Sequence, residues 1–362
     1  MTGDDPVLEV DNLHTQFDTR EGTVHAVDGV SFTVDEGEIV GIVGESGSGK
    51  SVNALSLVRL EDPGRITDGS INFQGTEMTE ADDRTIRRVR GDGMAMVFQD
   101  PMETLNPVFP VGEQIEESLK VHEEPDDQKL LDYLNVPLFG NRSERRKRRD
   151  TVAELMEQVG IPHPAERLDD YPHEFSGGMR QRAMLAIALA REPDLLIADE
   201  PTTALDVTIQ AAILDRIEEL KEDLGMSVVL ISHDFGVIAE VCDRVLVMYG
   251  GEIMESGTTE QILTEPKHPY TRALLDCMPQ NTRSKEPLRI IDGQVPNLND
   301  PEPGCMFASR CEYATDACRG EDVHHRGCGG EGHTAACCHL DRIEGDAGVE
   351  AEANAEAEVD GS

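Results

Sequence analysis

The sequence predicts an α/β fold in which short parallel strands, buried on both faces, alternate with helices. Glu38–Val43 is an apolar run that ends at a glycine-rich loop, and Ser51–Leu60 has the pattern of a helix that leaves this loop. Leu195–Ala198 and Ser227–Ile231 are continuous apolar runs that are followed by polar residues. Such runs are typical of strands covered by helices on both sides.

The loop after the first of these strands follows the pattern G-x-x-x-x-G-K-S. Its residues are Gly44, Glu45, Ser46, Gly47, Ser48, Gly49, Lys50 and Ser51. Glycines let the backbone curl so that its N–H groups point inward at phosphate oxygens, and the helix N-terminus adds a partial positive charge. We expect Lys50 to reach the β- and γ-phosphates of a nucleotide and the Ser51 hydroxyl to bind Mg²⁺.

Polar residues that suit hydrolysis follow the other two strands. Asp199 and Glu200 come after Leu195–Ala198, and His233 comes after Ser227–Ile231. Ligand sites in open α/β sheets lie at the carboxyl ends of strands. We therefore expect Asp199 to hold Mg²⁺, usually through water, and Glu200 to polarise the attacking water. In isolation two acids can simply end a strand, and a lone histidine is more often structural than catalytic; the upstream loop favours the functional interpretation.

Further motifs make the chain resemble the ABC ATPases, because they occur in the same order along the chain as in that family. They are Gln99, Ser176-Gly177-Gly178-Met179-Arg180-Gln181, Asp199-Glu200, Ala204-Leu205-Asp206 and His233. The resemblance implies an ABC-type nucleotide-binding domain in which Gln99 senses the γ-phosphate, contributes to the Mg²⁺ site and couples to a membrane subunit. It also implies that Ser176, Gly177 and Gly178 cap ATP held by an opposing subunit, and that Asp206 lies on the loop that crosses the dimer interface. His233 is expected to contact the γ-phosphate or hold a water.

Three residues bear on this resemblance: Phe17, whose role is open, and Phe175 and Met179, which depart from the family's usual pattern. Phe17 stands where the family places an aromatic residue that stacks on adenine, although a core phenylalanine is nearly as good an interpretation and His25 is a second candidate. Phe175 and Met179 replace the leucine and glutamine of many relatives. The phosphate-contacting Ser-Gly-Gly is intact, so the expectation of hydrolysis stands.

Length and composition predict two domains and a tail. The chain has 362 residues, of which 38% are hydrophobic, enough for a core of ordinary size. We expect a nucleotide-binding domain over 1–265 with a helical subdomain at about 100–185, a cysteine-rich domain over 266–343, and a disordered acidic tail over 344–362. The N-terminus does not look like a signal peptide, and no apolar run approaches the roughly 18 residues that span a bilayer. We therefore expect a peripheral protein at the cytoplasmic face of the membrane.

The net charge of −40 is spread along the chain, with few lysines. Self-repulsion on this scale is screened by molar salt, which predicts the cytoplasm of a halophilic archaeon. A charge-based partner or a solvating disordered region are the competing interpretations, but the acids alternate with periodic apolar positions. The charge also argues against nucleic acid as a partner, since its phosphates would be repelled.

The predicted helical subdomain contains two amphipathic segments, Val111–Val121 and Val152–Val159, and faces the transporter in the family. Between them, Glu123–Arg149 begins acidic and ends in a basic run. A solvated helix face before the next helix is the favoured interpretation of this run. A patch for anionic headgroups or for a partner's acidic residues is the alternative.

The C-terminal part is rich in proline, and six of the eight cysteines lie between Cys305 and Cys338. Without a signal sequence, metal ligation is favoured over disulfides. Five short motifs in this part resemble the C-terminal extension of oligopeptide/dipeptide transporter ATPases. They are His268-Pro269-Tyr270-Thr271, Val295-Pro296-Asn297-Leu298, Gly304-Cys305-Met306-Phe307, Arg310-Cys311 and Cys338-His339. That resemblance implies a [4Fe–4S] cluster on Cys305, Cys311, Cys318 and one of the last pair, with Cys338 favoured over Cys337.

One alternative to the cluster is Zn²⁺ bound by the surplus Cys328 with His324, His325 or His333. Whichever ion is held, we expect its role to be structural, because four thiolates can tether a small, loop-rich domain.

The resemblance as a whole implies the ATP-hydrolysing subunit of an ABC importer for di- and oligopeptides. Its partners would be a second ATPase subunit, two transmembrane permease subunits and an extracellular substrate-binding protein. Import of nickel or another solute is the alternative within the family. A soluble, non-transport ABC ATPase is opposed by the cysteine extension and by the lack of a long heptad insertion or a basic nucleic-acid face.

Overall fold

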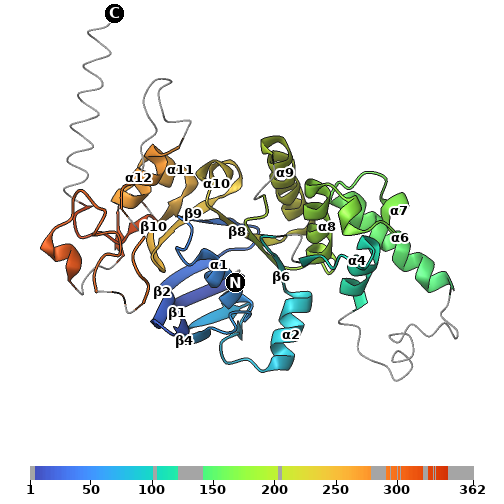
Figure 1. Cartoon of the computed structure of the whole chain (residues 1–362), viewed down its shortest axis with the longest axis horizontal. Coiled ribbons are helices and arrows are strands. Elements are labelled where there is room, and N and C mark those ends of the chain that lie inside the picture. Colours follow the sequence, from blue (N-terminus) through green and yellow to red (C-terminus); the bar gives the residue numbers. More distant parts are fainter. Residues whose placement is uncertain are drawn as a thin grey trace, which may run out of the picture. The chain divides into compact units, whose positions relative to one another are not determined.

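A computed structural model of the chain describes residues 5–100, 104–120, 142–202, 206–278, 291–293, 295–299, 301, 303–320, 325–328, 330 and 332–340. The predicted acidic tail lies outside the described residues, as does most of the 123–149 segment. The chain forms two compact units (Figure 1). The loop unit comprises residues 8–34 and 38–79 and the chain from 230 onward, and the helical unit comprises mainly residues 80–229.

The loop unit contains two sheets. Its strands are β1 (Leu8–Thr19), β2 (Gly22–Val34), β3 (Ile39–Val43), β4 (Arg65–Phe73), β5 (Thr76–Glu77), β9 (Arg244–Tyr249), β10 (Glu252–Thr258), β11 (Arg326–Gly327) and β12 (Thr334–Ala335). The first sheet is antiparallel, in the order β2-β1-β4-β5. In the second, β3 is parallel to β9, which pairs antiparallel with β10, and β12 and β11 continue from β10. The C-terminal segment therefore extends the sheet that carries β3.

Short helices complete the loop unit. They are α1 (Lys50–Leu57), α10 (Phe235–Val241), α11 (Thr259–Thr264), α12 (Pro269–Asp276) and the 3-10 turn η2 (Asp316–Arg319). Of these, α10, α11 and α12 are capped by a side chain. At the start of α11, the Thr258 hydroxyl accepts from the Gln261 N–H at 3.2 Å, and the Gln261 side chain accepts from the Thr258 N–H at 2.9 Å. At α12, proline occupies the first turn, where no N–H is needed. Local sequence thus determines where these helices begin.

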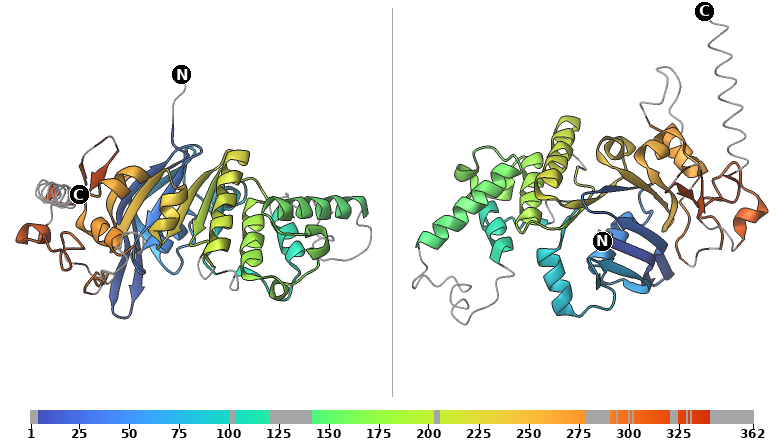
Figure 2. Two further views of the ribbon diagram at one scale, coloured as in Figure 1. Left: turned by 90° about the horizontal axis from the view of Figure 1, so that it is seen from above. Right: turned by 180° about the vertical axis from the view of Figure 1, so that it is seen from behind.

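The helical unit contains the parallel strand pair β6 (Met94–Val97) and β7 (Leu195–Asp199), together with most of the helices of the 80–229 segment. These helices are α2 (Asp83–Asp92), α4 (Val111–Lys120), α6 (Arg142–Gln158), α7 (Pro164–Arg167), the turn η1 (Pro172–Glu174), α8 (Gly177–Leu189) and α9 (Val207–Leu224). Helices α4, α6 and α8 pack against one another, as the further views show (Figure 2). Strand β8 (Ser227–Ser232) then carries the chain back into the loop unit.

The predicted parallel strands are present at the predicted places. Every residue of β3, β7 and β8 is buried, which explains why their sequences are continuous apolar runs without alternation. Among the described residues, no helix is long and apolar enough to cross a bilayer.

Two helices differ from their predicted bounds. The first, α1, ends at Leu57, three residues before the predicted end. The predicted Val152–Val159 helix is the second half of α6, which begins at Arg142 and includes the basic run. Arginine, lysine and glutamate are good helix formers, and no glycine or proline interrupts them. Arg149 forms a two-bond ion pair with Asp169, at 2.9 and 2.8 Å, in a solvated setting, in line with a solvated helix face.

Candidate nucleotide site and cysteine cavity

The phosphate-binding loop lies between β3 and α1, as predicted. Gly49 has a φ of 98°, and a Cβ there would lie 2.1 Å from the Ala26 carbonyl oxygen, so glycine is required. Lys50 is 4% exposed, and its Nζ donates to the carbonyl oxygens of Gly44 (2.8 Å) and Glu45 (2.9 Å). The remaining loop residues are Ser46, Gly47, Ser48 and Ser51. The ammonium group is therefore held inside the loop at the N-terminus of α1.

In the helical unit, two of the predicted catalytic residues, Gln99 and Glu200, meet at the ends of two neighbouring strands. β6 and β7 are parallel neighbours, and β7 ends at Asp199, which is 5% exposed. Glu200 follows with a φ of 46°, and its Oε2 accepts a hydrogen bond of 2.9 Å from Gln99 Nε2. A non-glycine residue in the left-handed region costs on the order of 1 kcal/mol, and such residues gather at functional sites. The fold thus holds Glu200 in an unfavourable backbone conformation beside a polar partner.

The Ser-Gly-Gly motif begins α8, as predicted. The Ser176 hydroxyl caps the helix by accepting from the Met179 N–H at 3.3 Å. A Cβ on Gly178 would lie 2.7 Å from Ile209 Cγ2, so the second glycine is needed for close packing against α9. Asp206 caps α9, accepting from the Thr208 and Ile209 N–H groups at 3.1 Å. The packed helices α8 and α9 therefore position both features within the helical unit: the backbone N–H groups that follow Ser176 and the capping residue Asp206.

The other predicted nucleotide-contacting residues lie in the loop unit. His233 is exposed at the end of β8, just before Asp234 caps α10. Phe17 is half-buried on β1, and its ring packs on Gly64, where a Cβ would lie 2.7 Å from the ring. His25 Nδ1 lies 3.3 Å from the Gln16 amide nitrogen. The role of Phe17 in adenine stacking stays a prediction.

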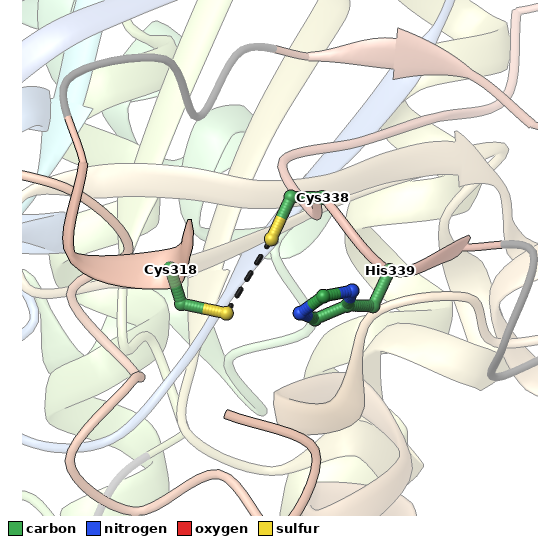
Figure 3. A group of neighbouring side chains, drawn as sticks. All are labelled: Cys318, Cys338 and His339. Atoms are coloured by element: carbon green, nitrogen blue, oxygen red, sulfur yellow. Dashed lines mark hydrogen bonds between the residues drawn. The ribbon is translucent and has the colours of Figure 1, made fainter. Parts of the chain in front are cut away.

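Five cysteines and two histidines line one cavity in the C-terminal segment. They are Cys305, Cys311, Cys318, Cys337, Cys338, His268 and His339. Figure 3 shows the Cys318 and Cys338 thiols turned toward each other beside the His339 ring. The two sulfur atoms are 3.4 Å apart, and with a ring nitrogen of His339 they form a group within 4.8 Å. The four predicted ligands thus line one cavity, but of these only Cys318 and Cys338 belong, with His339, to the group at ligand distance, and the predicted four-cysteine set stays a prediction.

The chemistry of this cavity suits a soft metal centre. All of its cysteines are free thiols. Burial raises the pKa of the Cys305 thiol to about 12 and that of the Cys311 thiol to about 11, so both are protonated at pH 7. A metal ion displaces such protons, because the thiolate is the ligand. Sulfur donors with an imidazole nearby fit zinc or an iron–sulfur centre and do not fit Mg²⁺ or Ca²⁺.

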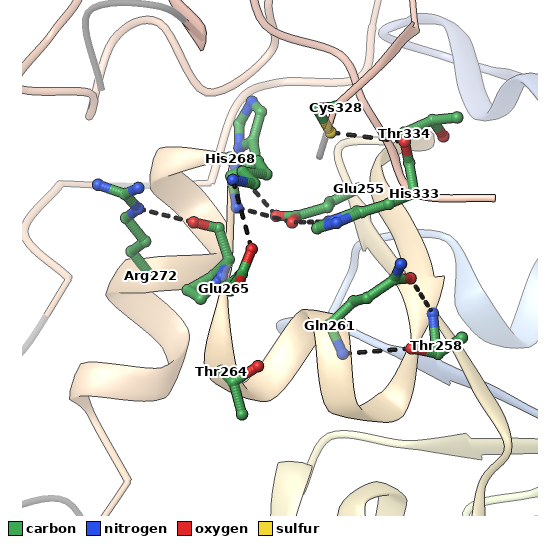
Figure 4. A network of polar contacts seen from close by, with 12 residues as sticks. Glu255, Thr258, Gln261, Thr264, Glu265, His268, Arg272, Cys328, His333 and Thr334 are labelled. Carbon is green, nitrogen blue, oxygen red and sulfur yellow. Dashed lines mark hydrogen bonds and ion pairs between the residues drawn. The ribbon is translucent and has the colours of Figure 1, made fainter. Parts of the chain in front are cut away.

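Among the described residues, the zinc alternative on Cys328 gains no histidine at ligand distance. His333 is 1% exposed, and its Nε2 lies 2.8 Å from the buried carboxylate of Glu255 (Figure 4). Cys328 lies against the carbonyl oxygen of His333, with its Sγ at 3.6 Å. His325 faces Thr334, and His324 lies outside the described residues. Proximity in sequence suggested this set, whereas in the structure the His333 ring contacts Glu255 of β10.

Comparison with known proteins decides the family. The family model described as ABC transporter matches residues 27–203, and the model described as oligopeptide/dipeptide transporter, C-terminal region, matches residues 254–318. The dipeptide transport ATP-binding protein DppD of Escherichia coli (strain K12) is 46% identical over 87% of this chain and 91% of its own length. The chain belongs to the ATP-binding subunits of the oligopeptide/dipeptide ABC transporter family.

Other members and solved structures agree with this assignment. DppD of Bacillus subtilis (strain 168) is 46% identical over 86% of this chain and 88% of its own length. The dimeric, post-hydrolysis structure of the ATP-binding cassette MJ0796 bound to ADP and Pi has a TM-score of 0.59 and 25% identity, covering 70% of this chain and 98% of that one. The fold is therefore that of an ABC nucleotide-binding domain, and this family member is an ABC ATPase that uses ATP and Mg²⁺.

Sequence reasoning missed three residues around these sites. His339 was predicted only as part of the Cys338-His339 motif, whereas it lines the cavity and its Nε2 lies 2.7 Å from the Thr315 hydroxyl. Arg310 and Tyr270 both contact Glu45 of the phosphate-binding loop. The available signal was that Arg310 adjoins a predicted ligand, Cys311, but no pattern linked it to a residue 265 positions away.

Proposed function

We propose that this chain hydrolyses ATP to power the uptake of di- and oligopeptides through a membrane permease. The observation that carries the catalytic half is the Gln99–Glu200 hydrogen bond beside the buried Asp199, at the ends of the parallel strands β6 and β7. Peptide uptake is supported by the DppD relatives, which are dipeptide transport ATP-binding proteins, and by the match to the C-terminal region of oligopeptide/dipeptide transporters.

In this proposal the phosphate-binding loop holds the triphosphate. Lys50 neutralises the β- and γ-phosphates, and Ser51, Asp199 and Gln99 provide the Mg²⁺ site. Glu200 accepts a proton from the attacking water, whose oxygen bonds to the γ-phosphorus while the bond to the bridging oxygen of ADP breaks. His233 stabilises the γ-phosphate, and Phe17 stacks on adenine.

The second half of each ATP site comes from another ATPase chain. Ser176, Gly177 and Gly178 cap the opposing ATP, with Asp206 at the interface, because N–H groups at the start of α8 attract anions. ATP that contacts both chains favours the closed dimer, and hydrolysis reopens it.

The remaining partners are two permease subunits, which place this chain peripherally at the cytoplasmic face, and an extracellular substrate-binding protein. Two apolar side chains that follow Gln99 in the chain, Val108 and Phe109, are 70% and 47% exposed and suit a permease contact.

The cysteine cavity would hold a [4Fe–4S] cluster on Cys305, Cys311, Cys318 and Cys338, within a small cysteine-rich C-terminal domain. Zinc held by the cavity's cysteines and His339 is the alternative ion. When bound, the metal centre would tether the turns of this segment. Protein purified without oxygen should absorb near roughly 400 nm, as thiolate-bound iron–sulfur clusters do. Colourless protein with one zinc per chain would reject the cluster and keep the metal.

The acidic composition supports a further proposal, that the protein works in a salt-rich cytoplasm. A net charge of −40 on 362 residues is self-repelling at low ionic strength.

The transport proposal is tested in cells that lack this chain, with uptake of labelled dipeptides, oligopeptides and nickel measured at high salt. Restoration of peptide uptake by the wild-type chain, and not by Glu200→Gln, is the expected result. Restoration of nickel uptake alone would assign the chain to metal import. Restoration of peptide uptake by both chains would reject the proposed role of Glu200.

A further inference from the structure

We propose that Arg310 is a positioning residue for the phosphate-binding loop, and that through Arg310 the affinity for ATP depends on the state of the cysteine cavity. The second part rests on the proposed metal at the cavity. The first part does not.

The Arg310 guanidinium is fully engaged. Its Nη1 donates to Glu45 Oε2 at 2.7 Å and to the Tyr249 hydroxyl at 3.1 Å. Its Nη2 donates to Glu45 Oε1 at 3.2 Å and to the Ile291 carbonyl at 2.9 Å. Its Nε donates to the Asp292 carbonyl at 3.0 Å. The side chain is 5% exposed, and every nitrogen of its rigid fork has an acceptor, so the position of the guanidinium determines where the Glu45 carboxylate lies.

Glu45 transmits this position to the phosphate-binding lysine. Its N–H donates to the Tyr270 hydroxyl at 2.9 Å, and its carbonyl oxygen accepts from Lys50 Nζ at 2.9 Å. Glu45 is thus held through its N–H, its carbonyl and its carboxylate. Loss of the guanidinium would release the carboxylate and leave an uncompensated negative charge in a loop that must accept a triphosphate.

Two of the three residues that hold Glu45, Arg310 and Tyr270, lie next to lining residues of the cysteine cavity in the chain. The turn from Cys305 to Cys311 is closed by backbone hydrogen bonds and carries Arg310 at its end. The Tyr270 N–H donates to His268 Nδ1 at 3.1 Å, and His268 lines the cavity with its Nε2 3.9 Å from Cys305 Sγ. A change in the spacing of Cys305 and Cys311 therefore moves the residue that holds the loop.

The coupling would arise because the short turn from Cys305 to Cys311 carries two cysteines of the cavity and also Arg310, which binds Glu45. A metal that binds both Cys305 and Cys311 would fix the turn and so favour the arrangement in which Arg310 binds Glu45. Because coupling between two binding events is reciprocal, ATP should in turn tighten the hold on the metal.

The positioning role is tested with Arg310→Gln, Glu45→Gln and the double variant, by titration with a fluorescent ATP analogue. We expect Arg310→Gln to bind about tenfold more weakly, as for a lost hydrogen bond to a charged group. Glu45→Gln in that background should restore part of the affinity, because it removes the uncompensated carboxylate. Arg319→Gln, in an exposed pair with Asp316 at 3.7 Å in the same segment, is the matched control and should bind like the wild type.

Wild-type affinity in Arg310→Gln, or losses that simply add in the double variant, would overturn the positioning role. Iron and zinc contents are measured on every variant, so that a general loss of the C-terminal structure is recognised as such. Arg310→Lys, which keeps the charge but not the fork, should fall between the wild type and Arg310→Gln.

The coupling is tested by comparing the full chain as purified with the same chain after a chelator has removed its metal. The stripped wild type should bind the analogue several-fold more weakly, whereas stripping should not change Arg310→Gln. In the reverse direction, ATP with Mg²⁺ should slow metal release from the wild type only. Equal ATP affinity with and without metal would reject the coupling. A chain that never contains metal would reject the proposed cluster and the coupling, and would leave the Arg310–Glu45 cycle to decide the positioning role.

Discussion

The Gln99 amide donates a 2.9 Å hydrogen bond to the Glu200 carboxylate, although the two residues are 101 positions apart in the chain. They meet because β6 and β7 are parallel neighbours and each residue follows one of these strands. Glu200 is held there with a φ of 46°, an unfavourable conformation for a residue with a side chain. The fold thus stabilises an arrangement that the local backbone does not favour.

Replacing Glu200 by glutamine should abolish ATP turnover while the fold and ATP binding persist. Glutamine keeps an oxygen that can accept from Gln99 but cannot take the proton of the attacking water, so turnover should fall by about 10²- to 10⁴-fold. Turnover and ATP-dependent dimerisation in molar KCl are the measurements. Glu192→Gln is a matched control, since Glu192 is exposed and also has a left-handed φ, of 48°. Turnover at the wild-type rate would remove Glu200 from the mechanism.

Replacing Glu255 by alanine should loosen the attachment of the C-terminal segment. The Glu255 side chain is fully buried, and its oxygens accept from the Lys267 N–H at 2.7 Å and the His268 N–H at 2.8 Å and contact His333 (Figure 4). Each buried group left without a partner costs about 1–3 kcal/mol. Hydrogen exchange at Lys267 and His268 should therefore accelerate by at least about tenfold.

The exposed Glu260, on α11 close by in sequence, provides the control for that experiment. Glu260→Ala should leave the exchange at both amides unchanged. Equal protection in Glu255→Ala and the wild type would show that these contacts do not hold the segment.

Glu252 should make the loop unit less stable as the pH rises. Burial, with the nearby charge of Asp28, raises the pKa of its carboxyl from 4.5 to about 8. The folded state therefore keeps the proton that the unfolded chain loses above pH 4.5, and stability declines as pH rises from 4.5 through 8. Each unit of pKa difference corresponds to about 1.4 kcal/mol. Glu252→Gln should remove this part of the slope, in urea unfolding between pH 5 and 8.5.

The exposed Glu9 on β1 serves as the comparison. Glu9→Gln should retain the wild-type dependence of the unfolding free energy on pH. Parallel profiles for Glu252→Gln and the wild type would contradict the assigned pKa shift.

Salt should stabilise the protein far more than it stabilises a near-neutral one. At 0.1 M the screening length is about 10 Å, and at 1 M it is about 3 Å, so the repulsion within a net charge of −40 falls steeply over this range. The melting temperature should rise as KCl is increased from 0.1 to 2 M. Sucrose at equal osmolality controls for general exclusion from the surface. A melting temperature that responds equally to both solutes would argue against charge screening.

Features that depend on neighbours in the chain were predictable from the sequence. The β3–loop–α1 arrangement lies within residues 39–57, and its apolar strand, glycines and helix are adjacent. The caps at Ser176 and Asp206 are likewise short-range. The length of α6 was missed because the apolar spacing began only at Val152, whereas charged residues with good helix propensity extend it back to Arg142.

The burial of Glu255 was not predictable from its surroundings in the chain. The β9–β10 pairing shifts register between Ile253 and Glu255, and such a bulge changes the direction in which side chains point. The carboxylate then meets His333, 78 positions away. Alternation along a strand cannot reveal this, because the bulge belongs to the pairing of two strands.

The sequence by itself determined the phosphate-binding loop, the buried strands, the candidate acids and the presence of a thiol-rich segment, since each depends on residue types at short spacing. Only the tertiary structure decided that Arg310 holds Glu45, that Cys337 and His339 join the cysteine cavity, and that His333 contacts Glu255. These contacts join residues far apart in the chain, and the path of the backbone between them, which short-range patterns do not specify, determines which side chains meet.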